Sequence, residues 1–279
     1  ELNLMLVALL RSIGIEAEPV LTSTRSHGKL LTQHPIFDQF NYMLVRAKLD
    51  GKYLLIDMGN KMRPMGYPAV KALNYKGWVI HDDYSHEWID LNMELTQNII
   101  AFSGQIENGK LVGKLRTRAN GYEGVNNRTA YSNEREGQYW EERLTNYVGV
   151  AAISDFKVEN YEDTEKWFQN EFDVALEEQV LDNDDYLYIS PVVYSDIKEN
   201  PFKSERRYYP IDYPYQFSDQ YVFELAIPAG YEVDQLPEAV RFILPSKGGE
   251  FKFSASEVNG KIQLHSRFKL TQVRFQPYE

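Results

Sequence analysis

Two histidines and two aspartates fall within the six residues from His81 to His86. Imidazole nitrogens and carboxylate oxygens can together hold zinc or another divalent ion. The segment reads as a loop and lacks the helical His spacing with an intervening Glu that zinc peptidases use. We therefore expect a solvated turn with no metal and no cofactor, and we name His81, Asp83 and His86 as the ligands if a metal is bound.

A second cluster consists of Tyr208, Tyr209, Tyr213 and Tyr215, which alternate with two prolines. A tyrosine can pack its ring and still keep its hydroxyl in water. The segment is therefore either a rim packed between a sheet and a loop or an exposed aromatic platform for a glycan or a peptide. The residues themselves do not decide between these two interpretations.

Composition excludes several other kinds of chemistry. The 279 residues include no Cys, so the chain contains no disulfide, no thiolate metal site and no cysteine nucleophile. Forty-one acidic residues against thirty basic ones give a net charge of −11, which disfavours nucleic acid as a partner. The length predicts two domains, and a 43 % hydrophobic content is enough for packed cores.

The elements that must position these residues begin with a helix. Apolar side chains at three- and four-residue spacing predict a buried core helix that Gly14 ends. The run is too short for a membrane span and has no basic leader. Because the chain opens in the middle of this pattern without Met, we expect a piece of a longer protein. The apolar positions are Leu2, Met5, Leu6, Leu9, Leu10 and Ile13.

Strands dominate the rest of the chain. Asp50-Gly51, Asn108-Gly109 and Asn259-Gly260 each separate two strand-like runs and predict tight hairpin turns. Residues 129–148 read as one helix inserted among the strands. The fold class is therefore α+β, with an α+β domain over residues 1–97 and a mostly antiparallel β-sandwich with one helix over residues 98–279.

Several stretches resemble a known family. Residues 2–20 are similar to the core helix and following strand of the transglutaminase-like superfamily, which has a papain-like fold. Residues 40–45 and 50–57 resemble the hairpin that carries His and Asp in its active members. Residues 199–203 with 207–210, and residues 227–231, are similar to a bacterial group of unknown function in which a β-rich domain follows such a module.

This resemblance implies a catalytic site that has lost its chemistry. Active members use a Cys at the start of the core helix, a His on the hairpin and an Asp that orients the His. The Cys position would lie about two residues before Glu1, and Tyr42, beside Asn41, stands at the His position. A phenol is a poor base near pH 7. Only Asp57 is retained, and His34 is the one nearby candidate for a replacement base.

We therefore predict a non-catalytic protein that binds an unknown protein, peptide or glycan. The resemblance places it in the periplasm or outside the bacterial cell. Two alternatives remain open. One is a cysteine peptidase or amidase whose nucleophile precedes Glu1 and whose base is a residue such as His34. The other is a glycan- or peptide-binding module that uses the tyrosine segment 208–215.

Overall fold

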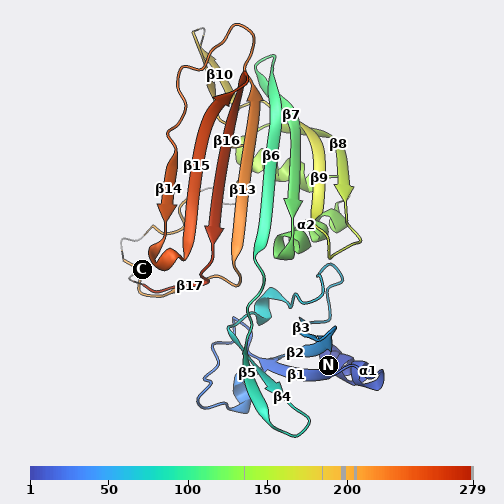
Figure 1. The fold of residues 1–279 in the computed structure, drawn as a ribbon. Helices are drawn as coiled ribbons and strands as arrows, with labels where there is room; N and C mark the ends of the chain where they lie inside the picture. Colours follow the sequence, from blue (N-terminus) through green and yellow to red (C-terminus); the bar gives the residue numbers. More distant parts are fainter. Residues whose placement is uncertain (135, 184, 196–198, 204–205, 278–279) are drawn as a thin grey trace. The chain divides into compact units, whose positions relative to one another are not determined.

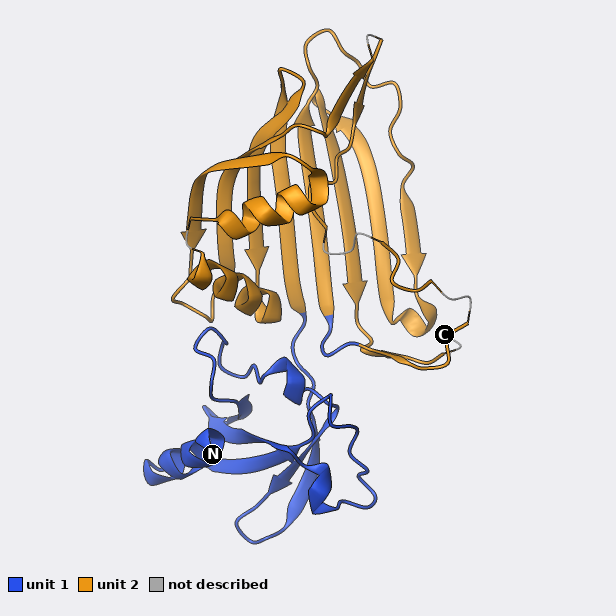
Figure 2. Ribbon diagram, turned by 180° about the vertical axis from the view of Figure 1, so that it is seen from behind, with its two compact units in different colours: residues 1–95, 213–216 blue, residues 96–212, 217–279 orange. Residues whose placement is uncertain are grey.

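The computed structural model describes the chain except residues 135, 184, 196–198, 204–205 and 278–279 (Figure 1). The chain divides into two compact units, coloured separately in Figure 2. The first unit contains residues 1–95 and 213–216, and the second contains residues 96–212 and 217–279. The predicted α+β class is confirmed, since three α-helices accompany a majority of strands in the described residues.

The first unit is an antiparallel five-stranded sheet with the order β3-β2-β1-β4-β5. The predicted turn at Asp50-Gly51 joins β2 to β3, and both residues have the positive φ that such a turn requires. The elements are α1 (Leu2–Ser12), β1 (Ala17–Thr22), η1 (Phe37–Gln39), β2 (Tyr42–Leu49), β3 (Lys52–Ile56), η2 (Val70–Ala72), β4 (Lys76–Ile80) and β5 (His86–Asp90).

Helix α1 forms as predicted, but the buried face differs from the expected one. Val7 packs against Ala17, Val45 and Ala47 of the sheet, and Asn3 is the other buried residue of the helix. Most of the predicted apolar stripe is exposed: Leu2, Met5, Leu9 and Ile13. The helix has apolar residues on almost every side, so periodicity could locate it but could not identify which side packs on the sheet.

The second unit is built on an eight-stranded sheet with the order β14-β15-β16-β13-β6-β7-β9-β8. All neighbouring strands pair antiparallel except β6 and β13, which are parallel. The strands are β6 (Thr96–Glu107), β7 (Lys110–Ala119), β8 (Ala151–Glu159), β9 (Phe168–Leu176), β13 (Phe217–Ala226), β14 (Val240–Ile243), β15 (Gly249–Val258) and β16 (Lys261–Leu270).

Two helices, α2 (Gly121–Asn133) and α3 (Gln138–Val148), lie on one face of this sheet (Figure 2). Trp140 and Leu144 of α3 pack there against Phe102, Phe172 and Phe223 of the strands. Two short pairs complete the unit, β10 with β11 and β12 with β17. Their bounds, with those of the helices, are α2 (Gly121–Asn133), α3 (Gln138–Val148), β10 (Val180–Asn183), β11 (Tyr186–Ile189), β12 (Ile211–Asp212), η3 (Pro245–Lys247) and β17 (Arg274–Phe275).

The single helix predicted over residues 129–148 is wrong, because the structure has two helices there. The first begins eight residues earlier, at Gly121, and the break before the second includes Gly137 at a φ of 84°. Gly121 and Gly124 are weak helix formers, and they concealed the start of α2. The turns predicted at Asn108-Gly109 and Asn259-Gly260 are confirmed, with positive φ at all four residues.

Candidate functional site

Asp57 lies directly after β3 and is the centre of a buried hydrogen-bond network. Its carboxylate accepts hydrogen bonds from Asn3 Nδ2 at 2.9 Å and from the backbone N–H of Ala69 at 2.8 Å. Arg63 Nη1 forms an ion pair with it at 2.7 Å, and the Asp57 side chain is fully buried. The network therefore joins α1, the end of β3 and the loop that follows it.

Tyr42, the first residue of β2, completes this network. Its hydroxyl lies 3.1 Å from each carboxylate oxygen of Asp57 and donates its hydrogen to them. The structure thus brings Tyr42 and Asp57 into direct contact. On β2, the partner of the carboxylate is therefore a phenol.

The electrostatics of this pair keep both groups in their ordinary protonation states. Burial opposes the ionisation of Asp57, but the hydrogen bonds from Asn3, Arg63 and Ala69 outweigh it and lower the pKa below 3.8. Burial, together with the negative charge of Asp57, raises the pKa of Tyr42 to about 12. At neutral pH the phenol holds its proton and the carboxylate is ionised, so neither group is suited to act as a general base.

The other two residues named with this site lie outside the network. Asn41 accepts a hydrogen bond from the backbone N–H of Thr24 at 2.8 Å and donates one to the Thr24 hydroxyl at 2.9 Å. His34 is exposed, and its carbonyl accepts a hydrogen bond from Gln39. The structure therefore gives Asn41 the role of fixing a loop and does not bring His34 to Asp57.

A cleft of about 620 Å³ lies next to this network, at the first turn of α1. Tyr42, Asn41 and Asn3 supply its polar lining. The remaining lining is apolar apart from Glu1 and comprises Leu2, Leu21, Phe37, Phe40, Met43 and Met58. The position that the family resemblance assigns to catalysis is thus beside an open, mostly apolar hollow.

The histidine and aspartate cluster does not form a ligand set. His81 Nδ1 pairs with Glu18 at 2.6 Å, and Asp83 accepts hydrogen bonds from Ser85. The rings of His86 and Trp78 form an edge-to-face contact, with their centroids 5.1 Å apart. Within the described part of the chain, no three metal-ligating side chains come together.

The tyrosine segment does not form a single platform inside one unit. Tyr208 and Tyr209 belong to the second unit and are 79 % and 81 % exposed. Tyr213 and Tyr215 belong to the first unit and are half-buried. The structure therefore exposes the first pair and packs the second.

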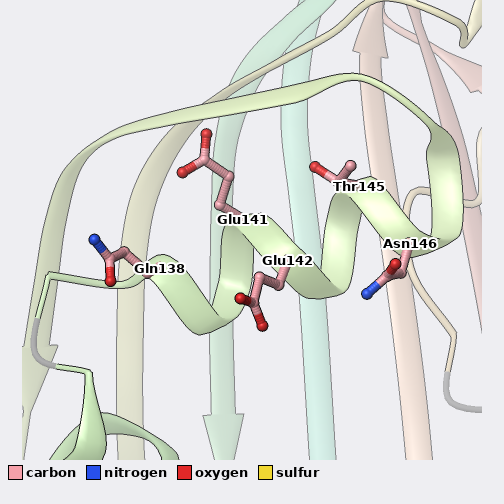
Figure 3. Close-up of a pocket in the computed structure, with 5 residues that line it drawn as sticks. All are labelled: Gln138, Glu141, Glu142, Thr145 and Asn146. Atoms are coloured by element: carbon pink, nitrogen blue, oxygen red, sulfur yellow. The ribbon is translucent and has the colours of Figure 1, made fainter.

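A further hollow of about 710 Å³ lies along α3 in the second unit (Figure 3). Its lining consists of Gln138, Glu141, Glu142, Thr145 and Asn146, all of which come from this one helix. The opposite face of the helix carries the core residues Trp140 and Leu144. These polar residues are thus the outward side of an amphipathic helix.

The sequence did not identify two members of the Asp57 network, Asn3 and Arg63. Asn3 stands 54 positions before Asp57 and lies on a helix that reads as apolar. One signal was available, because an Asn in the first turn of an apolar helix needs hydrogen-bond partners when it is buried. Arg63 lies in an irregular segment, where the sequence carries no comparable signal.

The family match and the structural match cover different shares of the chain. Residues 185–279 match a family described as a domain of unknown function with a solved structure, DUF3858. No match is found among curated proteins. Among solved structures, a chain from Parabacteroides distasonis ATCC 8503 described as a "putative protease" is similar, with 10 % identity and a TM-score of 0.48. The match covers 99 % of the present chain, which spans 38 % of the length of that structure.

In the described residues no helix is long and apolar enough to cross a membrane.

Proposed function

We propose that the first unit is a transglutaminase-like domain without catalytic activity, and that the chain acts as a binding or scaffold protein outside the bacterial cytoplasm. One observation carries the proposal: the buried Asp57 carboxylate is held by Asn3, Tyr42, Arg63 and the Ala69 backbone. In the active members that the first unit resembles, the aspartate orients an imidazole. Here its oxygens already hold a phenol, an amide, a guanidinium and a backbone N–H.

The absence of Cys from the chain supports the same proposal. A thiol outside this sequence would still need a base. Tyr42, with its pKa raised to about 12, is a poor one at neutral pH. The network instead serves stability, because its hydrogen bonds join the carboxylate to α1, to β2 and to the loop after β3.

The direct test of this proposal is a measurement of catalytic turnover. The purified chain and its Tyr42→His variant are incubated with an unstructured peptide mixture, and cleavage or acyl transfer is followed by mass spectrometry. We expect no turnover above buffer from either protein, since restoring an imidazole alone supplies no nucleophile. Turnover by the wild-type chain that disappears in Asp57→Asn would overturn the proposal.

The enzymatic alternative makes a separate prediction about the longer protein. If a nucleophile precedes Glu1 and His34 is its base, the longer protein carries a thiol that iodoacetamide labels rapidly. His34→Ala would then slow both the labelling and peptide cleavage. We expect no dependence on His34, because its side chain is exposed and makes no contact with Asp57.

A second candidate function rests on the exposure of Tyr208 and Tyr209. Two neighbouring rings about four-fifths exposed could stack on a sugar or a peptide. The double variant Tyr208→Ser with Tyr209→Ser would abolish binding to a glycan array. Equal binding by wild type and variant would remove this candidate.

A further inference from the structure

The eight-stranded sheet of the second unit has two edge strands, β8 and β14, and only β8 is built to prevent further pairing (Figure 1). In β8 the register shifts between Ser154 and Lys157, and Asp155 there has a φ of 50°. From Ser154 onward, the exposed side chains of β8 are polar or charged. A bulge and charged side chains are common means of keeping an edge strand from pairing with another chain.

The opposite edge strand, β14, is regular and mostly apolar. Its register with β15 is continuous, and in the described residues it pairs with β15 alone. All four of its residues are exposed, and three of them are apolar. Phe242 is 63 % exposed and Ile243 is 53 % exposed. An exposed apolar edge strand is a template on which another strand can pair.

The backbone of β14 has hydrogen-bonding groups directed away from the sheet. The N–H of Leu244, the residue after β14, donates to Gly249 O at 2.9 Å and so points toward β15. Backbone groups alternate in direction along an antiparallel strand. The N–H and C=O of Phe242 therefore also point toward β15, whereas those of Arg241 and Ile243 point outward, where an added strand would bond them.

The sheet face that carries the Arg241 side chain has an excess of positive charge beside this edge. Arg241 lies directly opposite Lys252, and Lys252 lies directly opposite Arg267. Like charges in directly opposite positions destabilise a sheet. Glu250 is the carboxylate among them, and it pairs with both Arg241 and Lys252. This arrangement costs stability in a chain whose net charge is −11, unless a partner supplies further carboxylates.

The other half of the same face shows how cations are compensated within one chain. Lys114 of β7 lies opposite Asp173 of β9, and Arg116 lies opposite Glu171. The two ion pairs have distances of 2.7 Å and 2.8 Å. In that half, each of these cations has an acid directly across the ladder. Beside β14 the corresponding acids would have to come from an added strand.

The other face of β14 is apolar. The Phe242 ring stacks with that of Phe251 at 6.4 Å between centroids, and Val240 on the same face is 37 % exposed. Side chains alternate between the two faces along a strand. A strand that pairs with β14 would therefore place acidic residues on the side of Arg241 and apolar residues on the side of Phe242.

From these features we infer that β14 binds an extended segment of a partner protein in which acidic and apolar residues alternate. The segment adds to the sheet as a new edge strand. The inference deepens the proposed binding role and rests on it, since it names the class of partner. It involves no residue of the Asp57 network, so the peptide-binding result and the turnover result above can fail separately.

The experiment measures fluorescence anisotropy of a labelled peptide of alternating glutamate and valine, titrated with the purified chain. We expect saturable binding. The same peptide with methylated backbone nitrogens cannot donate to the edge strand and should bind roughly tenfold more weakly or worse. A peptide of alternating lysine and valine should not bind, because it adds cations beside Arg241.

Two variants of the chain locate the binding site. Ile243→Pro removes an outward N–H without removing a bond to β15, and an edge strand tolerates such a proline. It should weaken binding roughly tenfold. If Ile243→Pro fails to fold, Arg241→Glu replaces it, because this exposed substitution places a carboxylate beside the peptide's own. The matched control is Arg118→Glu, an equal change of charge at an exposed position of β7 on the same face.

Three results would overturn the inference. The methylated or the lysine peptide could bind as tightly as the glutamate peptide. Arg118→Glu could weaken binding as much as Arg241→Glu, which would indicate a general charge effect. Alternatively, analytical ultracentrifugation could show a dimer of the chain that Ile243→Pro dissociates, which would make a second copy the occupant of the edge.

Discussion

Asp57 in the first unit and Arg128 in the second are buried charges that each join separate segments, and the two charges are held in different ways. In the first unit Asp57 has a cationic partner, Arg63, and three neutral donors. In the second unit Arg128 of α2 is 1 % exposed, and its Nη2 lies 2.7 to 3.1 Å from three backbone carbonyls, those of Asn160, Asp163 and Lys166.

The two networks differ in what they require of the sequence. The Arg128 guanidinium fixes a single loop to α2 through carbonyls that any sequence would supply. The Asp57 network instead needs particular side chains from three parts of the unit. A network that depends on side-chain identity can gain or lose chemistry by a single substitution, such as one at Tyr42.

The largest expected loss of stability comes from removing the Asp57 carboxylate. Asp57→Ala leaves Arg63 buried without its counter-ion and should lower the free energy of unfolding by about 3–5 kcal/mol. Urea titration of the first unit's transition measures this. The control is Asp90→Ala, which breaks the exposed pair with Lys76 and should cost less than about 1 kcal/mol. Equal stability of Asp57→Ala and wild type would refute the structural role.

Removing the Arg128 guanidinium from the second unit should lower the free energy of unfolding somewhat less than Asp57→Ala does in the first. Arg128→Met keeps a long apolar stem but leaves buried carbonyls unsatisfied, and we expect a loss of about 2–4 kcal/mol. The exposed Arg118, whose guanidinium lies 5.2 Å from the Trp167 ring centroid, provides the matched control Arg118→Met. A control that destabilised as much as Arg128→Met would show that the carbonyl contacts contribute little.

A smaller effect is expected from Tyr42→Phe. The substitution keeps the ring and removes only the hydroxyl that donates to Asp57, where three other donors remain. We expect a loss of about 1.5 kcal/mol in urea titration. An increase in stability would mean that the hydroxyl is not a productive donor.

The smallest but most specific difference between the Asp57 and Arg128 networks should appear in how their stability contributions depend on acid pH. The pKa of Asp57 is lowered in the folded state, so its contribution is fully present above pH 3.8, the ordinary value, and is lost as the pH falls through the folded value. The stability difference between wild type and Asp57→Ala should shrink over that window. The difference for Arg128→Met should stay constant, because a guanidinium does not titrate there. Parallel pH profiles would contradict this distinction.

Local signals in the sequence were enough for the elements with strong turn or helix patterns. Asp50-Gly51, Asn108-Gly109 and Asn259-Gly260 adopt positive φ readily, so the turn chemistry itself located three hairpins. The parallel pairing of β6 with β13 is different. It joins strands more than a hundred residues apart and leaves no mark in either strand's own pattern.

Only those residues of the candidate site that belong to a recognisable motif could be predicted from the sequence. Tyr42 and Asp57 lie within one hairpin, so the family resemblance could pair them before their 3.1 Å contact was known. Asn3 and Arg63 come from other segments and meet Asp57 only through tertiary packing. The misassigned face of α1 is a related case, because Asn3 and Val7 are its buried residues and Asn3 bonds Asp57, while Leu2 and Met5 are exposed.

The most direct test of the central claim is a double-mutant cycle between Tyr42→Phe and Asp57→Asn, measured by urea unfolding at pH 7. If the phenol and the carboxylate form a stabilising pair in place of a catalytic one, the two substitutions should be coupled by about 1–2 kcal/mol. A coupling below about 0.3 kcal/mol, the level of independent sites, would contradict the claim.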